Sequence, residues 1–416
     1  MKIGKKKEKA KNVNDDFLAQ EAKEDQETAT AYTLDIPDDE IWTYQIEGLQ
    51  APHINQPYKN AKLKKILIVI VLIVAIGLAM YFSVRAVHSD TYEYKDLGDG
   101  TYELVKFSNP GDIIDITIDY VVDLETGEKD TSKPISVINE YAFNCDEKIN
   151  SITFGKDVRE IDGKSIYSCW WIQNVWIDDE NPYYCDLDGV IYNKDLTEII
   201  FYPTDHDKYL REQLGYNNLL DDDGNPMEDL WGITERYDEA FLAEYNKQIR
   251  TYVVPSTVTT VGELAFAYSN ITDLYLPEGI KTMEAMAVFK NSVLLNLYSY
   301  TADDVITDVT YKAVESMSSV YNSLPEGLEY IGSDCFYYCR GLSYIYIPSS
   351  VTYIGHHAFW DAIYKDNGEL YGITEINAEA DEEAFNQVET GDEWRPKYDY
   401  MLFRKSVDVN YSAERQ

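Results

Sequence analysis

The chain has 416 residues, and its 74 acidic residues outnumber its 36 basic ones, which gives a formal net charge of −38 at pH 7. Residues 1–65 carry a net charge of −1, so residues 66–416 carry −37. Such a surface repels nucleic acid and anionic membranes, and this excludes both as primary partners. A cationic ligand or divalent ions fit the charge better; the alternative is that the acidic surface only keeps the protein soluble.

Residues 1–65 begin with a lysine-rich stretch, continue with an acidic one, and hold too few periodic apolar positions to build a core. We therefore predict a disordered cytoplasmic tail. Residues 34–49 are an exception, because Ile41, Trp42 and Tyr44 place apolar and aromatic side chains among acidic ones. This segment is interpreted as a short motif for a cytoplasmic partner or, alternatively, as a segment that contacts lipid headgroups.

Residues 66–84 form an uninterrupted apolar stretch without charges, long enough to cross a hydrocarbon core about 30 Å thick. A secretory signal peptide is the competing interpretation, but 65 residues precede the stretch, and its length exceeds a signal core of roughly 7–15 residues. Residues 62–65 hold three lysines on its N-terminal side, whereas the other side offers only Arg85 and His88. The positive-inside rule then predicts a single-pass plasma-membrane protein with a cytoplasmic N-terminus and an extracellular remainder.

After this segment one sequence motif recurs, in which an aliphatic residue is followed by a short turn that ends in an aromatic residue. It is found at residues 138–143 (INEYAF), 261–266 (VGELAF), 331–336 (IGSDCF) and 354–359 (IGHHAF). Neighbouring copies begin 22 or 23 residues apart, inside the roughly 20–29 range of leucine-rich repeats. Weaker copies are predicted at residues 283–289, 306–314 and 373–385.

Each copy is accompanied by alternating apolar residues that predict a short strand. These strands are expected at residues 149–154, 172–177, 271–277, 294–297, 317–320, 342–347 and 373–376. One such unit cannot bury its own apolar side, so neighbouring units must stack into a continuous core. The sequence therefore predicts an α+β repeat solenoid of short strands and turns.

Residues 351–359 and 341–348 resemble the BspA-like bacterial leucine-rich repeats, whose units read I-G-x-x-A-F-x-x-C-x-x-L-x-x-I-x-I-P-x-x-V. Residues 181–203 are similar to a hairpin that these proteins insert between repeats, and residues 98–105 to the strand pair before the first repeat. The resemblance spans about residues 90–390. It implies a bacterial surface protein used for adhesion or protein binding, although a fold alone does not settle function.

The chain is thus expected to begin with a disordered tail at 1–65 and a transmembrane helix at 66–84. A strand pair at 85–134 starts the solenoid, and a first repeat block with the hairpin follows at 135–203. An insertion at 204–250 separates it from a second repeat block at 251–390, and a C-terminal tail occupies 391–416. In the insertion, residues 219–226 predict a turn and residues 238–245 a short helix. Long insertions in repeat proteins often emerge on the binding face. A calcium loop is not predicted, because Leu219 and Leu230 occupy its first and last ligand positions.

Cys145, Cys169 and Cys339 fall at one position of the repeat, which predicts buried core thiols. Cys335 lies four residues before Cys339, but no second pair with zinc-finger spacing accompanies them, so no metal site is predicted. Residues 205–207 (DHD) are interpreted as an ordinary polar loop and not as an acid–base cluster. Because the chain has no catalytic motif, we expect neither an enzyme nor a cofactor.

Residues between the apolar strand positions point away from the core, because side chains alternate along a strand. Five aromatic residues are expected on this outer face, bordered by carboxylates such as Asp273 and Glu375. Exposed Trp and Tyr are enriched in protein interfaces, whereas the alternative is that tyrosine is simply a favourable strand residue. The predicted ligand-binding residues are Trp176, Tyr275, Tyr298, Tyr344 and Tyr346.

The sequence thus predicts a membrane-anchored bacterial cell-surface protein that binds an extracellular protein or other macromolecule without catalysis. A rival prediction is an envelope structural or signalling component that acts through its cytoplasmic tail. A second rival, a hydrolase with a site in residues 204–250, is disfavoured because the insertion has no paired catalytic groups.

Overall fold

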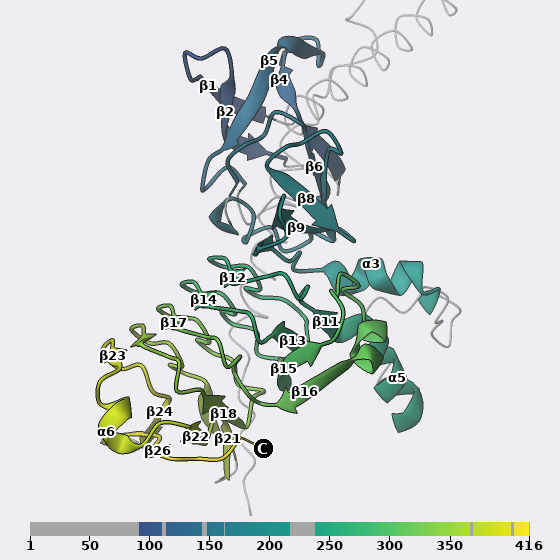
Figure 1. Cartoon of the computed structure of the whole chain (residues 1–416). Coiled ribbons are helices and arrows are strands. Elements are labelled where there is room, and N and C mark those ends of the chain that lie inside the picture. The colour runs from purple at the N-terminus through teal and green to yellow at the C-terminus, as the bar shows by residue number, and fades with distance from the viewer. Residues whose placement is uncertain are drawn as a thin grey trace, which may run out of the picture. The chain divides into compact units, whose positions relative to one another are not determined.

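A computed structural model describes residues 91–109, 114–143, 148–161, 163–216, 238–366, 369–400 and 403–415 (Figure 1). The chain divides into two compact units, residues 1–77 and 78–416, and all the described residues belong to the second. The predicted cytoplasmic tail, the membrane span, the turn at 219–226 and Cys145 lie outside the described residues. Within the described part, no helix is long and apolar enough to span a membrane.

Two sheets form the N-terminal portion of the described chain. One has the strand order β1 (Thr91–Asp96), β2 (Tyr102–Ser108), β5 (Lys129–Ile138) and β4 (Tyr120–Val122). The other, here named the first strand sheet, joins β3 (Ile114–Ile118), β6 (Ile149–Phe154) and β7 (Asn174–Ile177) in parallel. Its apolar residues stack in register, with Ile152 opposite Val175, so the strands predicted at 149–154 and 172–177 are confirmed.

A second strand sheet joins β11 (Thr251–Val253), β13 (Asp273–Pro277), β15 (Asn296–Ala302) and β16 (Met317–Tyr321). A bridge between Ser323 and Tyr346 leads on to β18 (Tyr344–Ile347), β22 (Glu375–Ala378) and β26 (Val409–Asn410). Neighbouring strands pair in parallel except β15 and β16, which are antiparallel. The strands predicted at 271–277, 294–297, 342–347 and 373–376 are confirmed.

The turns of the repeats form a sheet of their own, the turn sheet. It contains β8 (Tyr184–Leu187), β9 (Val190–Asn193), β10 (Glu198–Phe201), β12 (Thr260–Val261), β14 (Thr282–Met283), β17 (Tyr330–Ile331), β19 (Tyr353–Ile354) and β23 (Glu389–Thr390). The pairing is parallel from β10 onward, so the aliphatic residue that opens one copy of the repeat lies beside that of the next. β8 and β9 pair antiparallel, which confirms the predicted hairpin.

Hydrogen bonds continue beyond these short strands, from the turn of one copy to the turn of the next. The amide of Phe266 donates to the carbonyl of Ala287, and that of Phe336 to Ala358, each at 2.7 Å. The ring of Phe336 also stacks on that of Phe359, with centroids 5.3 Å apart. The repeat motif therefore satisfies part of its buried backbone groups through its neighbour, in addition to hydrogen bonds within one copy such as that from Ala358 to Gly355.

The glycine of the motif is required by this close stacking. A Cβ atom at Gly355 would lie 2.4 Å from the amide nitrogen of Ser333, and one at Gly332 would lie 2.4 Å from that of Ala285. Real Cβ atoms do not come so near to backbone atoms. Only glycine lets the backbones of neighbouring turns approach to this distance.

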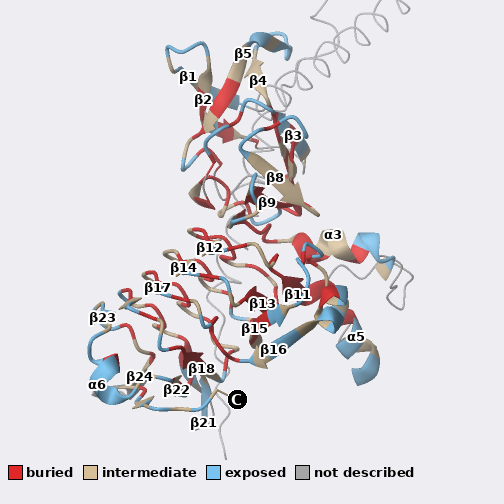
Figure 2. Cartoon of the chain, viewed as in Figure 1, coloured by how far each residue is buried: buried red, intermediate tan, exposed pale blue. Residues whose placement is uncertain are grey.

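The core is a band of fully buried residues that follows the repeats (Figure 2). Cys169 and Cys339 lie in it, so their prediction as core thiols is confirmed, and Cys335 lies there as well. The thiol of Cys339 donates to the carbonyl of Val288 at 3.0 Å. Burial raises the pKa of Cys335 and of Cys339, so both thiols stay protonated at neutral pH.

The prediction of a weak repeat copy at residues 306–314 is wrong. Met283 of β14 pairs directly with Ile331 of β17, so residues 306–314 contribute no strand to the turn sheet. The segment instead leads into a 3₁₀ helix, η3 (Tyr311–Ser316), which precedes the antiparallel strand β16. It lacks the glycine and the Ala-Phe pair of the stronger copies, so it has no residues that fit the turn sheet.

Helices are few. α3 (His206–Gln213) and α5 (Glu239–Arg250) lie within the insertion, and Asp238 caps α5 by accepting from the amide of Phe241 at 2.8 Å. The helix predicted at 238–245 is therefore confirmed, and it extends to Arg250. The remaining elements are η1 (Gly163–Ser165), α6 (Glu382–Phe385), and the hairpins β20 (Ile363–Asp366) with β21 (Glu369–Gly372) and β24 (Lys397–Tyr400) with β25 (Phe403–Ser406).

Candidate functional site

Four tyrosines are in line from the second strand sheet, which holds Tyr275, Tyr298 and Tyr321, to β18 of the adjoining three-stranded sheet, which holds Tyr344. Tyr298 is the register partner of both Tyr275 and Tyr321. Ring centroids lie 4.3 Å apart for Tyr275 and Tyr298, 5.5 Å for Tyr298 and Tyr321, and 5.9 Å for Tyr321 and Tyr344. We name these four residues the tyrosine row.

Exposure differs along the tyrosine row. Tyr321 is 39% exposed, and Tyr298 and Tyr344 are half-buried. Tyr275 is only 8% exposed, and Ile306 and Ala313, which belong to the segment 306–314 outside the turn sheet, lie in the same apolar cluster. The prediction that Tyr275 lies on an open face is therefore wrong, and the accessible part of the row begins at Tyr298.

Tyr346 is 4% exposed, so the prediction that it lies on an open face is also wrong. Its hydroxyl donates to the carbonyl of Ala413 at 3.5 Å, which places the C-terminal segment against it. The guanidinium of Arg415 donates to Ser323 Oγ at 2.9 Å and to Glu326 Oε1 at 2.6 Å. It also contacts Glu278 and Ser299, so the C-terminal segment is fixed to β15 and to the segments that follow β13 and β16.

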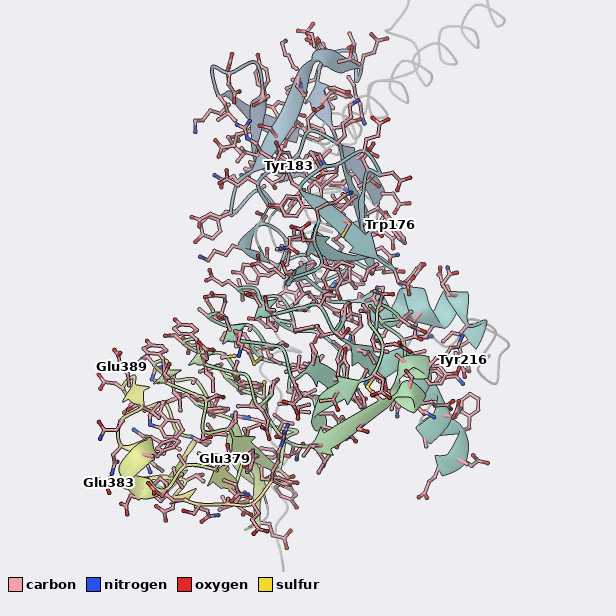
Figure 3. The ribbon with its side chains drawn as sticks, viewed as in Figure 1. Trp176, Tyr183, Tyr216, Glu379, Glu383 and Glu389 are labelled. Carbon is pink, nitrogen blue, oxygen red and sulfur yellow. The ribbon has the colours of Figure 1, made fainter. Side chains whose placement is uncertain are left out.

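Trp176 is half-buried and lies on β7 of the first strand sheet (Figure 3). Its ring contacts Tyr209 of α3, with centroids 6.0 Å apart. The structure therefore brings Tyr298 and Tyr344 together through Tyr321, and it does not bring Trp176 into the same row.

Polar groups border the tyrosine row on both sides. Asp273 Oδ1 accepts from Asn296 Nδ2 at 2.6 Å, and Glu375 Oε1 accepts from Asn410 Nδ2 at 3.1 Å. Burial raises the pKa of Tyr298 above its usual value, with a further contribution from the negative charge of Asp273. The hydroxyl of Tyr298 therefore stays protonated at neutral pH and remains able to donate as well as accept hydrogen bonds.

Tyr321 is the member of the row that sequence reasoning missed. The repeat pattern predicts a strand at 317–320, whereas β16 extends to Tyr321. A signal was present, because Tyr275, Tyr298, Tyr321 and Tyr344 follow one another at 23-residue intervals. The strand position of this copy is kept even though its turn is lost.

Residues 205–207 do not form the predicted polar loop, because Asp205 directly precedes α3, and His206 and Asp207 begin the helix and are buried. His206 Nδ1 lies 2.7 Å from the carbonyl oxygen of Gln173. Asp207 pairs with Arg250 at 3.5 Å. Burial and the negative charge of Asp207 raise the pKa of Asp205 to about 7. The histidine and Asp207 thus each have a structural partner outside the triplet.

No group of three or more His, Cys, Asp or Glu side chains is placed to hold a metal ion in the part of the chain that the structure describes. Of the described cysteines, Cys185 is partly exposed, whereas Cys169, Cys335 and Cys339 are buried. The most developed surface feature of the second strand sheet is therefore the tyrosine row.

Parallel strands that stack at a fixed repeat, with one aliphatic turn position per copy, define a leucine-rich-repeat protein. A sequence profile described as the BspA type leucine rich repeat region matches six copies, at residues 124–204 and 234–364. The chain belongs to the BspA-type leucine-rich-repeat family, as its resemblance implied.

Several solved structures are similar to this chain. The pneumococcal vaccine antigen PcpA is 13% identical, with 75% of this chain and 87% of that chain covered and a TM-score of 0.37. A leucine-rich repeat protein from Bacteroides ovatus is 14% identical (73% and 65% covered, TM-score 0.33), and a leucine rich cell surface protein from Faecalibacterium prausnitzii is 17% identical (78% and 94% covered, TM-score 0.26). No curated protein matches the chain. At these identities and TM-scores, the similarities carry no inference about function.

Proposed function

We propose that this chain is a bacterial cell-surface protein, anchored by a transmembrane helix at residues 66–84, whose extracellular repeat solenoid binds a protein partner without catalysis. The tyrosine row carries the proposal. Tyr298, Tyr321 and Tyr344 form a continuous, partly accessible aromatic strip. Tyrosine supplies large, rigid contact area at low cost in conformational entropy, and it is enriched where proteins bind proteins.

The geometry of the row favours a protein over a glycan. Tyr275 and Tyr298 stack with an interplanar angle of 10°, so each covers a face of the other. Ring edges and hydroxyls then remain for a ligand, and these groups suit hydrogen bonds with backbone and side chains. A sugar that packs on aromatic rings needs accessible ring faces. The acidic charge of residues 66–416 further favours a partner with a basic surface.

The proposal is tested by measuring the binding of the full-length protein to a panel of extracellular proteins and cell-wall glycans. The variant Tyr298→Ala/Tyr321→Ala/Tyr344→Ala is compared with a control that removes three exposed tyrosines elsewhere, Tyr183→Ala/Tyr364→Ala/Tyr371→Ala. We expect a protein from the panel to bind, and the row variant to bind it at least about tenfold more weakly while the control binds normally.

Binding that the row variant retains in full would contradict the proposed site. Binding to glycans alone would contradict a protein partner. If no member of the panel binds, the rival function gains support, in which residues 34–49 recruit a cytoplasmic partner; a pull-down from cytoplasm with residues 1–65 tests that function directly.

A further inference from the structure

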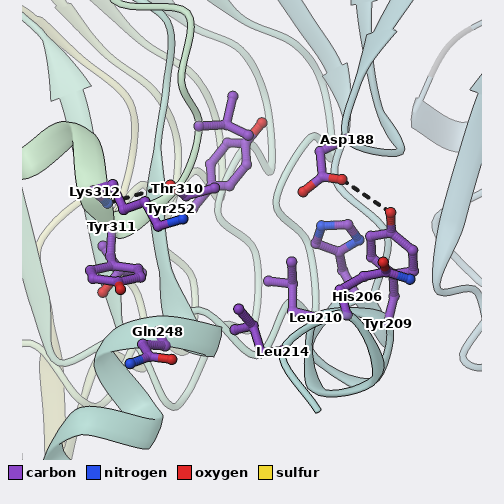
Figure 4. Close-up of a pocket in the computed structure, with 13 residues that line it drawn as sticks. Asp188, His206, Tyr209, Leu210, Leu214, Gln248, Tyr252, Thr310, Tyr311 and Lys312 are labelled. Atoms are coloured by element: carbon purple, nitrogen blue, oxygen red, sulfur yellow. Dashed lines mark hydrogen bonds between the residues drawn. The ribbon is translucent and has the colours of Figure 1, made fainter. Parts of the chain in front are cut away.

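A cavity of about 190 Å³ lies where α3, α5 and β11 meet. Asp188, His206 and Tyr209 line one wall, and Thr310, Tyr311 and Lys312 line the opposite wall (Figure 4). We name it the α3 pocket. It is separate from the tyrosine row, none of whose residues line it.

Asp188 gives the α3 pocket an uncompensated negative charge. Its Oδ1 accepts from the hydroxyl of Tyr209 at 3.1 Å, and it makes no ion pair with any residue that the structure describes. The nearby cation Arg250 is already paired with Asp207. A hydrogen bond from a tyrosine leaves the formal charge of the carboxylate in place.

His206 does not supply the missing positive charge. The residue is 1% exposed, and burial lowers the pKa of its imidazole below the usual value. The ring is therefore neutral at pH 7, with Nδ1 beside the carbonyl of Gln173 at 2.7 Å. The negative charge of Asp188 also raises the pKa of Tyr209, after burial, to about 12, so this hydroxyl stays protonated.

The rest of the α3 pocket combines apolar and aromatic side chains with a few polar ones, among them Gln213, Gln248 and Thr251. Leu210 and Val309 contribute aliphatic surface, and Tyr209, Tyr252 and Tyr311 contribute rings. A carboxylate among aromatic rings attracts an organic cation, because the rings add to the electrostatic attraction when the cation lies over a face. The aliphatic walls suit the methylene stem that lysine and arginine carry behind their charged ends.

We propose that the α3 pocket binds a lysine or arginine side chain that a partner protein presents, with the cationic end at Asp188 and the stem against Leu210 and Val309. The identity of the donor as a protein rests on the proposed function, whereas the preference of the pocket for a basic side chain does not. Lys312 is exposed and lines the opposite wall, so its charge opposes the incoming cation and limits the affinity.

The test uses the full-length protein and isolated side chains as probes. Binding of Nα-acetyl-lysine methylamide and Nα-acetyl-arginine methylamide is measured by calorimetry or ligand-observed NMR, with the matching norleucine derivative as the neutral probe. We expect saturable binding of both basic probes and at least about tenfold weaker binding of norleucine, because charge-assisted contacts are lost. These probes do not report on the tyrosine row, so failure here is distinguishable from failure of the proposed function.

Asp188→Asn removes the charge with little change of shape, and asparagine tolerates the left-handed backbone that Asp188 adopts at φ 51°. This variant should lose at least about tenfold in affinity for the lysine probe, whereas Asp195→Asn, which removes an exposed charge from the same hairpin region, should not. Lys312→Ala should bind more tightly than the wild type. Equal binding of norleucine and lysine, unchanged binding by Asp188→Asn, or no binding of the basic probes would overturn the proposal.

Discussion

Asp205 is the residue whose local environment most clearly conflicts with its charge. It precedes α3, and burial raises its pKa to about 7, with repulsion by Asp207 next and partial compensation by Lys208 and Arg211. In the unfolded chain an aspartate has a pKa of about 4. Between these values the native state binds the proton and the unfolded state does not, so the stability that this group contributes is lost as pH rises from about 4 to about 7.

Asp205→Asn should remove this pH dependence. At about pH 7.5 the variant should be more stable than the wild type by roughly 1–3 kcal/mol, and near pH 4 the two should be equally stable. Urea denaturation at both pH values measures the difference. Asp195→Asn is the control, because Asp195 is exposed. A difference of the same size at both pH values would show that the charge of Asp205 is not its cause.

At the scale of the turn, close backbone approach makes Gly355 irreplaceable. Gly355→Ala forces a Cβ against Ser333, so we expect a free energy of unfolding lower by about 2 kcal/mol. Gly279→Ala is the matched control, since the nearest atoms to its Cβ lie at 3.9 Å, an ordinary contact. That variant should remain within about 0.5 kcal/mol of the wild type. A Gly355→Ala variant as stable as Gly279→Ala would contradict this role of close packing, because the entropy effect of replacing glycine by alanine is by itself stabilising.

The C-terminal segment is the element that Arg415 holds in place. Its side chain is 16% exposed and pairs with Glu278, itself 19% exposed, as well as with Glu326. Arg415→Ala should lower the free energy of unfolding by about 2 kcal/mol, because partly buried carboxylates lose a charged hydrogen-bond partner. It should also speed hydrogen exchange at residues 411–415. The neighbouring exposed Glu414 provides the control, and a Glu414→Ala variant that loses as much stability would refute this role.

The strands could be predicted because apolar alternation and a strong turn motif agree, as at residues 342–359. At 306–321 the strand predicted at 317–320 is confirmed as β16, but the turn predicted at 306–314 is wrong, because its spacing fits the repeat while its residues do not fit the turn sheet. Its strand stays in line at Tyr321, and its turn packs on Tyr275. The 23-residue spacing predicts where a strand lies, whereas a turn joins the turn sheet only if it also has the glycine and the Ala-Phe pair of the motif.

At the scale of the whole molecule, exposure of the candidate site depended on segments distant in sequence. Alternation along a strand predicts that Tyr275 and Tyr346 point away from the core, and both lie outside the main apolar cluster. Alternation along a strand gives no information about which other segments cover these two tyrosines. Ile306 and Ala313 cover one and the C-terminal segment covers the other, so of the predicted tyrosines only Tyr298 and Tyr344 remain partly accessible.

The central claim is that the tyrosine row binds a protein partner. Substitution of Tyr321 tests this claim most directly, because Tyr321 is the most exposed member of the row and lies between the other two accessible tyrosines. The measurement is the dissociation constant of full-length Tyr321→Ala for the protein selected from the extracellular panel, beside Tyr183→Ala as an exposed control. The account predicts a dissociation constant at least about tenfold larger for Tyr321→Ala, as for a residue central to an interface, and no change for Tyr183→Ala. An unchanged dissociation constant in a folded Tyr321→Ala variant would contradict it.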